Sequence, residues 1–117
     1  MALTNDFLNK MVEFLNTGSV YMSLHTADPG TTGDNEVSGS PYNRLEVTFG
    51  TPAAGVVTNT NNPEFSVPDN TTVTHIGLWS AVTDGTFYIS EDPTDRVLET
   101  GDLYRLDSWT ITAAAGT

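Results

Sequence analysis

The chain has 117 residues and no cysteine, and its four Lys and Arg against 15 Asp and Glu give a net charge of −11. We therefore expect no binding to nucleic acid or to an anionic membrane, since both need a basic surface, and neither disulfides nor thiolate zinc sites. No apolar run approaches the length of a membrane span, and the acidic N-terminus does not resemble a signal peptide. The length predicts a single domain over residues 1–117.

Residues Leu3 to Thr17 are predicted to form a helix within an N-terminal segment, residues 1–18. Thr4 suits the N-cap, and Gly18 suits a left-handed position after the last turn. The helix either caps an open end of a β core or docks on a neighbouring subunit. The wide apolar face leaves both open; it consists of Phe7, Leu8, Met11, Val12, Phe14 and Leu15.

A strand and a long loop follow the helix. Val20 to His25 alternates between two faces of a strand, with Val20, Met22 and Leu24 on one and Tyr21, Ser23 and His25 on the other. Asp28-Pro29-Gly30 then begins a surface loop from Thr26 to Tyr42. Loops longer than about 12 residues without structure of their own are usually functional or disordered. We expect this loop to pack against something, for example a neighbouring chain.

The rest of the chain is predicted to form short strands separated by turns, at 45–49, 56–59, 65–67, 72–79, 86–90, 97–98 and 103–112. The 72–79 strand is apolar on both faces and should be central, with Gly77 allowing the close approach of a ring or backbone. Between Leu106 and Trp109 the last strand should bulge or change sheet. About eight antiparallel strands predict a mainly β fold, a β-sandwich or jelly-roll-like barrel over residues 19–117, with one helix.

No catalytic constellation stands out in the sequence. His25 and His75 lie in predicted strands, without a nucleophile elbow or an activated serine motif. We interpret them as histidines bonded to neighbouring loops. Paired carboxylates occur only in loops, without the aromatic-lined cleft that glycosidases need. We therefore predict that the chain is not an enzyme, and we assign no catalytic or cofactor-binding residue.

Loop acids provide the one alternative that involves a cofactor. Calcium takes oxygen ligands, and two groups could supply them: Asp28, Asp34 and Glu36, or Glu91, Asp92 and Asp95. Neither loop has the spacing of an EF-hand. We expect no cofactor and no metal site, with structural calcium as the alternative.

Several short sequence segments, spread over nearly the whole chain, are similar to those of a known protein family. The first runs from Ser23 to Gly30, and further segments lie at 32–33, 35–39, 42–44, 54–61, 65, 72–79 and 101–102 and in the final strand. They resemble a family of small tailed-bacteriophage virion proteins, commonly labelled phage tail fibre or minor structural proteins. The acidic 91–95 loop and Trp109 depart from the family pattern. The resemblance implies a structural protein of the virion and no catalytic residues.

Two positions in the virion fit this resemblance. We favour a capsid decoration (cement) protein on the outer surface of the virion, assembled in the host cytoplasm and bound to the major capsid protein or to other virion proteins. A short chain without a repetitive stalk fits decoration, and packaged DNA would repel an acidic surface. Decoration proteins often form trimers, so we expect a homotrimer. The alternative is a tail fibre or minor tail protein with an adaptor or glycan-receptor role, for which Tyr42, Tyr88 and Tyr104 are candidates.

The contact surface is predicted on the N-terminal helix and the long loop. The broad apolar face of the helix and the length of the loop motivate this choice. The candidate interaction residues are Phe7, Met11, Phe14, His25, Asp28 and Tyr42.

Overall fold

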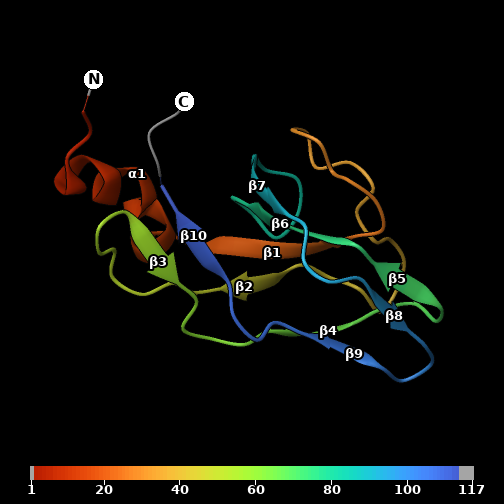
Figure 1. The fold of residues 1–117 in the computed structure, drawn as a ribbon. Coiled ribbons are helices and arrows are strands. Elements are labelled where there is room, and N and C mark those ends of the chain that lie inside the picture. The colour runs from red at the N-terminus through yellow and green to blue at the C-terminus, as the bar shows by residue number, and fades with distance from the viewer. Residues whose placement is uncertain (1, 114–117) are drawn as a thin grey trace.

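One helix precedes ten short strands in residues 2–113, the part of the chain that the computed structural model describes (Figure 1). This helix is not long and apolar enough to cross a membrane. The elements in chain order are α1 (Asn5–Thr17), β1 (Val20–His25), β2 (Leu45–Val47), β3 (Val56–Thr58), β4 (Glu64–Ser66), β5 (Thr71–Val73), β6 (His75–Trp79), β7 (Phe87–Glu91), β8 (Arg96–Leu98), β9 (Leu103–Arg105) and β10 (Thr110–Thr112).

The strands form a small antiparallel β-sandwich, which confirms the predicted fold class. Four of them make a sheet in the order β2-β1-β6-β7, and the others pair as β10-β3, β4-β9 and β5-β8. In the four-stranded sheet Met22 pairs with Leu78 and Leu24 with Ile76. Both faces of β1 and β6 are buried, because one faces the core and the other is covered by a loop. The predicted central strand is therefore confirmed as central.

Two predicted strands are each divided in the structure. The 72–79 strand breaks at Thr74, whose N–H donates to the His25 carbonyl at 2.9 Å, and β5 leaves to pair with β8. The 103–112 strand breaks at Leu106, whose N–H donates to the Pro63 carbonyl at 3.0 Å. Its two halves pair with different partners, β4 and β3, which confirms the predicted change of sheet.

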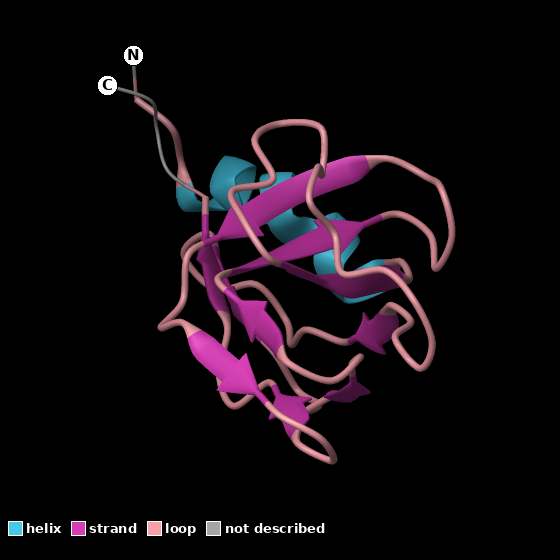
Figure 2. Ribbon diagram, turned by 90° about the vertical axis from the view of Figure 1, so that its right-hand side faces the viewer, coloured by secondary structure: helices cyan, strands magenta, loops and turns pink. Residues whose placement is uncertain are grey.

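Helix α1 caps one end of the β core. Val12 and Leu15 are buried in the hydrophobic core, and Asn16 Nδ2 donates to the Phe49 carbonyl at 3.1 Å. Figure 1 shows α1 at the end of the molecule where β3 and β10 lie, and Figure 2 shows it running behind strands of the sandwich. Of the two roles predicted for the helix, the structure shows the first, in which α1 packs on the β core of its own chain.

The ends of α1 confirm one predicted cap and correct the other. Thr4 Oγ1 accepts a hydrogen bond from the Phe7 N–H at 3.2 Å, as expected of an N-cap. Gly18 has φ −106° and ψ 174°, so the predicted left-handed conformation is wrong. The chain runs extended from Gly18 into β1, and a Cβ on Gly18 would lie 3.1 Å from the Phe14 carbonyl oxygen. Close approach, not backbone handedness, is what makes glycine suitable there.

Candidate functional site

The loop of residues 26–44 folds back over one face of the four-stranded sheet, at the end of the molecule opposite α1 (Figure 1). The Val37 N–H donates to the Leu24 carbonyl at 2.9 Å, and the Thr26 N–H to the Asn35 carbonyl at 3.0 Å. A Cβ on Gly33 would lie 2.3 Å from the Trp79 ring, so only glycine allows the loop to lie this close. We expected this loop to pack against something, and in the structure it packs against the chain's own sheet.

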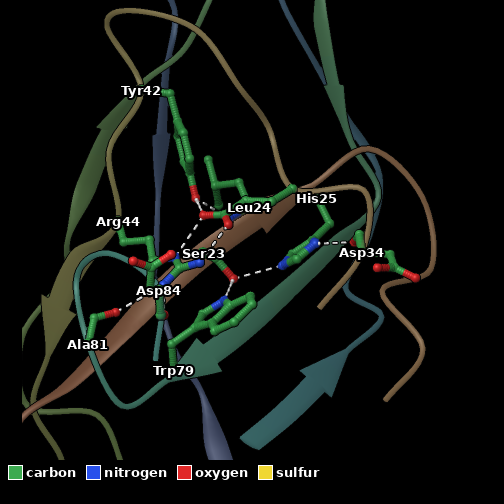
Figure 3. Close-up of polar contacts among 10 residues, drawn as sticks. Ser23, Leu24, His25, Asp34, Tyr42, Arg44, Trp79, Ala81 and Asp84 are labelled. Atoms are coloured by element: carbon green, nitrogen blue, oxygen red, sulfur yellow. Dashed lines mark hydrogen bonds and ion pairs between the residues drawn. The ribbon is translucent and has the colours of Figure 1, made fainter. Parts of the chain in front are cut away.

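A chain of hydrogen bonds joins the sheet to this loop (Figure 3). His25 Nδ1 lies 2.8 Å from the Asp34 carbonyl oxygen, which can only accept, so Nδ1 carries a hydrogen. In the neutral ring Nε2 is then an acceptor, and the Ser23 hydroxyl donates to it at 2.7 Å. Trp79 Nε1 donates to Ser23 Oγ at 2.9 Å. All the bonds therefore run in one direction, from Trp79 through Ser23 and His25 to Asp34.

The electrostatic setting keeps His25 neutral. Burial lowers the pKa of His25, because charging the ring under the loop would remove a cation from water. The Asp34 carbonyl and the Glu36 carboxylate oppose this effect and raise the pKa, while His75 and Arg44 lower it further. The net pKa lies below the ordinary value for histidine, in agreement with the single direction of the hydrogen bonds.

Ser23 and His25 have the spacing of a nucleophile and its general base, but not the setting of one. Both side chains are fully buried, the hydroxyl accepts the indole N–H of Trp79, and a backbone carbonyl holds the imidazole in place of a carboxylate. A substrate cannot reach the hydroxyl while the loop is in place. The interpretation of His25 as a histidine bonded to a neighbouring loop is confirmed.

Arg44 ties the end of the loop to its middle and to the sheet (Figure 3). Its Nε and Nη2 donate to the two oxygens of Glu36, each at 2.9 Å, and Nη1 donates to the carbonyls of Ala81 at 3.0 Å and Asp84 at 2.7 Å. The guanidinium carbon lies 3.7 Å from the centre of the Trp79 ring. This is a bidentate ion pair combined with a cation–π contact, a geometry that only arginine supplies.

Tyr42 and Glu36 complete the attachment. The Tyr42 hydroxyl donates to Glu36 Oε2 at 2.7 Å and accepts from the Leu24 N–H at 3.1 Å. Burial alone would raise the pKa of Glu36, but the hydrogen bonds from Arg44 and Tyr42 bring it below its ordinary value. Burial and the neighbouring carboxylate raise the pKa of Tyr42. Near neutral pH the Glu36 carboxylate is therefore ionised and the Tyr42 hydroxyl keeps its hydrogen.

The structure separates the predicted interaction residues into two groups. His25 is fully buried and Tyr42 is partly buried, each bonded within the chain. For His25 this corrects the predicted contact role, because its side chain has no exposed surface. Asp28 is exposed, but its carboxylate accepts the Gly30 N–H at 2.8 Å in a local turn. In the described residues no group of three or more His, Cys, Asp or Glu could hold a metal ion.

Phe7, Met11 and Phe14 form the second group, on the flank of α1 that does not face the core. Their side chains are 52%, 44% and 38% exposed. Tyr88 of β7 joins them, with its ring in an edge-on contact 5.1 Å from that of Phe14. We call these four residues the α1 patch. Sequence reasoning missed the place of Tyr88 in it, because a register shift opposite Leu78 and Trp79 alters the side on which β7 residues lie.

Of the three tyrosines considered for a glycan platform, only Tyr88 has an exposed side chain. Tyr104 is buried, and Tyr42 stacks on Phe65 with ring centres 6.3 Å apart. Tyr88 itself packs against Phe14. The three residues therefore do not present a joint aromatic surface.

Comparison with known families decides to which group of proteins this structure belongs. The family model described as podophage GP4 fiber I protein gp80 matches residues 2–114. The chain belongs to this family. It is therefore a structural component of a phage virion, and the resemblance seen in the sequence is confirmed. No match was found among curated proteins. Within this gp80-family chain, the α1 patch is where exposed aromatic and methionine side chains gather, among the residues that the structure describes.

Proposed function

We propose that the chain is a non-enzymatic subunit of the phage tail fibre that binds a neighbouring virion protein through the α1 patch. The observation that carries the proposal is the family match over residues 2–114. The name of that family fits a tail fibre better than the capsid decoration role that we favoured from the sequence. Decoration, with the major capsid protein as partner, is the second candidate, and the acidic net charge of −11 fits such a position on the outer shell.

The α1 patch has the chemistry of a protein contact. Large apolar side chains that cluster on a surface stabilise a complex when a partner removes them from water. Burial of each half-exposed side chain contributes about 1 kcal/mol to the free energy of binding. Phe7, Met11 and Phe14 follow one another at spacings of four and three residues, the spacing at which helices pack side by side. A partner helix or an apolar groove fits this surface.

We further propose that the chain folds as one domain over residues 1–117 and acts as a homotrimer on the outer surface of the virion, after assembly in the host cytoplasm. One hydrophobic core that takes in both α1 and the strands supports a single domain. The net charge of −11 supports an outer position, because packaged DNA would repel the chain.

The copy number of the chain per virion distinguishes the two candidates. Quantitative mass spectrometry against the major capsid protein should give a small number of copies for a fibre subunit, in a multiple of three for trimers. A copy number similar to that of the major capsid protein would contradict the fibre role and support decoration.

The contact surface is tested with the double variant Phe7→Ser/Met11→Ser. We expect normal folding, because both side chains lie largely outside the core, and loss of the protein from purified virions. Val97→Ser is the matched control, since Val97 is 67% exposed on β8, outside the patch. Virions that contain the double variant at the control level would contradict the role of the patch.

A further inference from the structure

We propose that protonation of His25 releases the 26–44 loop from the sheet, so that mild acid opens this part of the molecule while the sandwich stays folded. This device is independent of the fibre role and of the partner that the α1 patch binds. It follows from the direction of the buried hydrogen bonds and from the position of the loop above them.

The hydrogen bonds that hold the loop require the neutral form of the His25 ring. In the neutral ring His25 Nε2 accepts from Ser23 at 2.7 Å, while Nδ1 donates to the Asp34 carbonyl at 2.8 Å. A proton on Nε2 turns this acceptor into a donor. Ser23 Oγ would then face two donors, His25 and Trp79, and its own hydrogen would lose its acceptor. Ser23 Oγ has no other hydrogen-bond partner among the described residues. An unpaired buried hydroxyl costs about 1–3 kcal/mol.

The charged groups around the ring do not compensate for a buried imidazolium. Burial is the largest influence and opposes the charge. On the loop side, Glu36 favours the cation but is itself paired with Arg44, which disfavours it. On the sheet side His75 also disfavours it, and the only help from Asp34 comes through its backbone carbonyl. The cation can gain full hydration only when the loop lifts away.

Apart from the side-chain bonds of His25, Tyr42 and Arg44 described above, few main-chain bonds join the loop to the sheet, so the loop can open locally. Two of these flank the bridge between His25 and Glu36. The Val37 N–H donates to the Leu24 carbonyl, and the N–H of Thr26, the residue that directly follows β1, donates to the Asn35 carbonyl. The strand beneath is held separately, by five residue pairs between β1 and β6. Opening the loop therefore leaves the register of the sheet intact. Local openings of this kind require less free energy than global unfolding.

The direction of the pH dependence follows from the pKa of His25. In the closed form this pKa lies below the ordinary 6.5, whereas in the open form a solvated ring has about the ordinary value. The open form therefore binds more protons below about pH 6.5, and its population rises as the pH falls. Above this range both forms are neutral and the loop stays closed.

Hydrogen exchange of individual amides, followed by NMR on the full chain, tests this proposal. Between about pH 7.5 and pH 5, after correction for intrinsic rates, we expect protection of the Val37 and Thr26 amides to fall about tenfold or more. Protection of amides between β1 and β6, such as those of the Tyr21 and Trp79 pair, should not change. Equal protection of the loop amides at both pH values would overturn the proposal, as would equal loss in loop and sheet.

Two variants assign the effect to the correct histidine. His25→Asn removes the titrating group, so any remaining loop protection should no longer depend on pH in this range. His75→Asn is the matched control: His75 is partly exposed, with Nε2 3.8 Å from Asp92, and its loss should leave the acid response unchanged. If His25→Asn does not fold, the imidazole signals of the wild-type chain decide. The His25 signals must titrate together with the loss of loop protection, and titration that follows His75 would contradict the proposal.

Discussion

Arg44 and Arg105 show how differently two arginines of one chain can contribute to stability. Arg44 is nearly buried, pairs with both oxygens of Glu36 and lies over the Trp79 ring. Arg105 is half exposed and forms a single-oxygen ion pair with Glu64 at 3.3 Å. Exposed ion pairs contribute little because water and salt screen them, whereas buried bidentate pairs leave unpaired groups behind when they are broken.

We therefore expect Arg44→Lys to lower the free energy of unfolding by about 2 kcal/mol, because an ammonium cannot reproduce the planar fork or the stacking. Arg105→Lys, the matched control, should change it by less than about 0.5 kcal/mol. Urea denaturation followed by circular dichroism measures both. Equal effects of the two substitutions would show that the arrangement around Arg44 adds no stability beyond that of a surface pair.

At the scale of elements, α1 has one stripe that the core needs and one that it does not. Leu15 is 1% exposed and Met11 is 44% exposed, although the two lie one turn apart on the same helix. Apolar side chains on a helix stabilise the fold only where they are removed from water.

Leu15→Ala should accordingly lower the free energy of unfolding by about 2–4 kcal/mol, since it leaves a cavity in the core. Met11→Ala should lower it by less than about 1 kcal/mol. Thermal unfolding of the two variants, side by side with the wild-type chain, measures the difference. A Met11 effect as large as that of Leu15 would mean that the α1 patch belongs to the core, and the proposed contact surface would have to lie elsewhere.

The whole molecule carries far more acid than base, with a net charge of −11. Lys10, Arg44 and Arg105 are already paired with carboxylates of the chain, for example Lys10 Nζ at 3.8 Å from Glu13. Repulsion among the remaining carboxylates opposes the compact state. Salt screens this repulsion over a distance of about 10 Å at 0.1 M.

Adding sodium chloride to about 0.5 M should therefore raise the midpoint of thermal unfolding, since like charges then repel each other less. Potassium chloride at the same ionic strength is the control and should give the same increase. A fall in the midpoint would mean that the surface ion pairs outweigh the repulsion. A much larger increase with calcium chloride at matched ionic strength would instead support the structural calcium considered from the loop acids.

Local chemistry in the sequence determined several features of this protein. The N-cap at Thr4, the alternation of β1 and the turns between strands depend on residues a few positions apart, whose geometry is set by backbone sterics and local hydrogen bonds. Gly77 was predicted to allow close approach, and a Cβ there would lie 2.6 Å from the Phe87 ring and 2.7 Å from Ser23 Oγ. The fold class and the family likeness followed from such local signals summed over the chain.

Tertiary structure alone decided what surrounds the candidate site. The partners of Arg44 at Ala81 and Asp84 lie 37 and 40 residues away along the chain, and the contact between Phe14 and Tyr88 depends on how a helix lies across a strand. Burial of His25 likewise depends on the loop that returns over it. Residue types state what a side chain can do, but strand register and packing determine which distant groups meet and which of them water can reach.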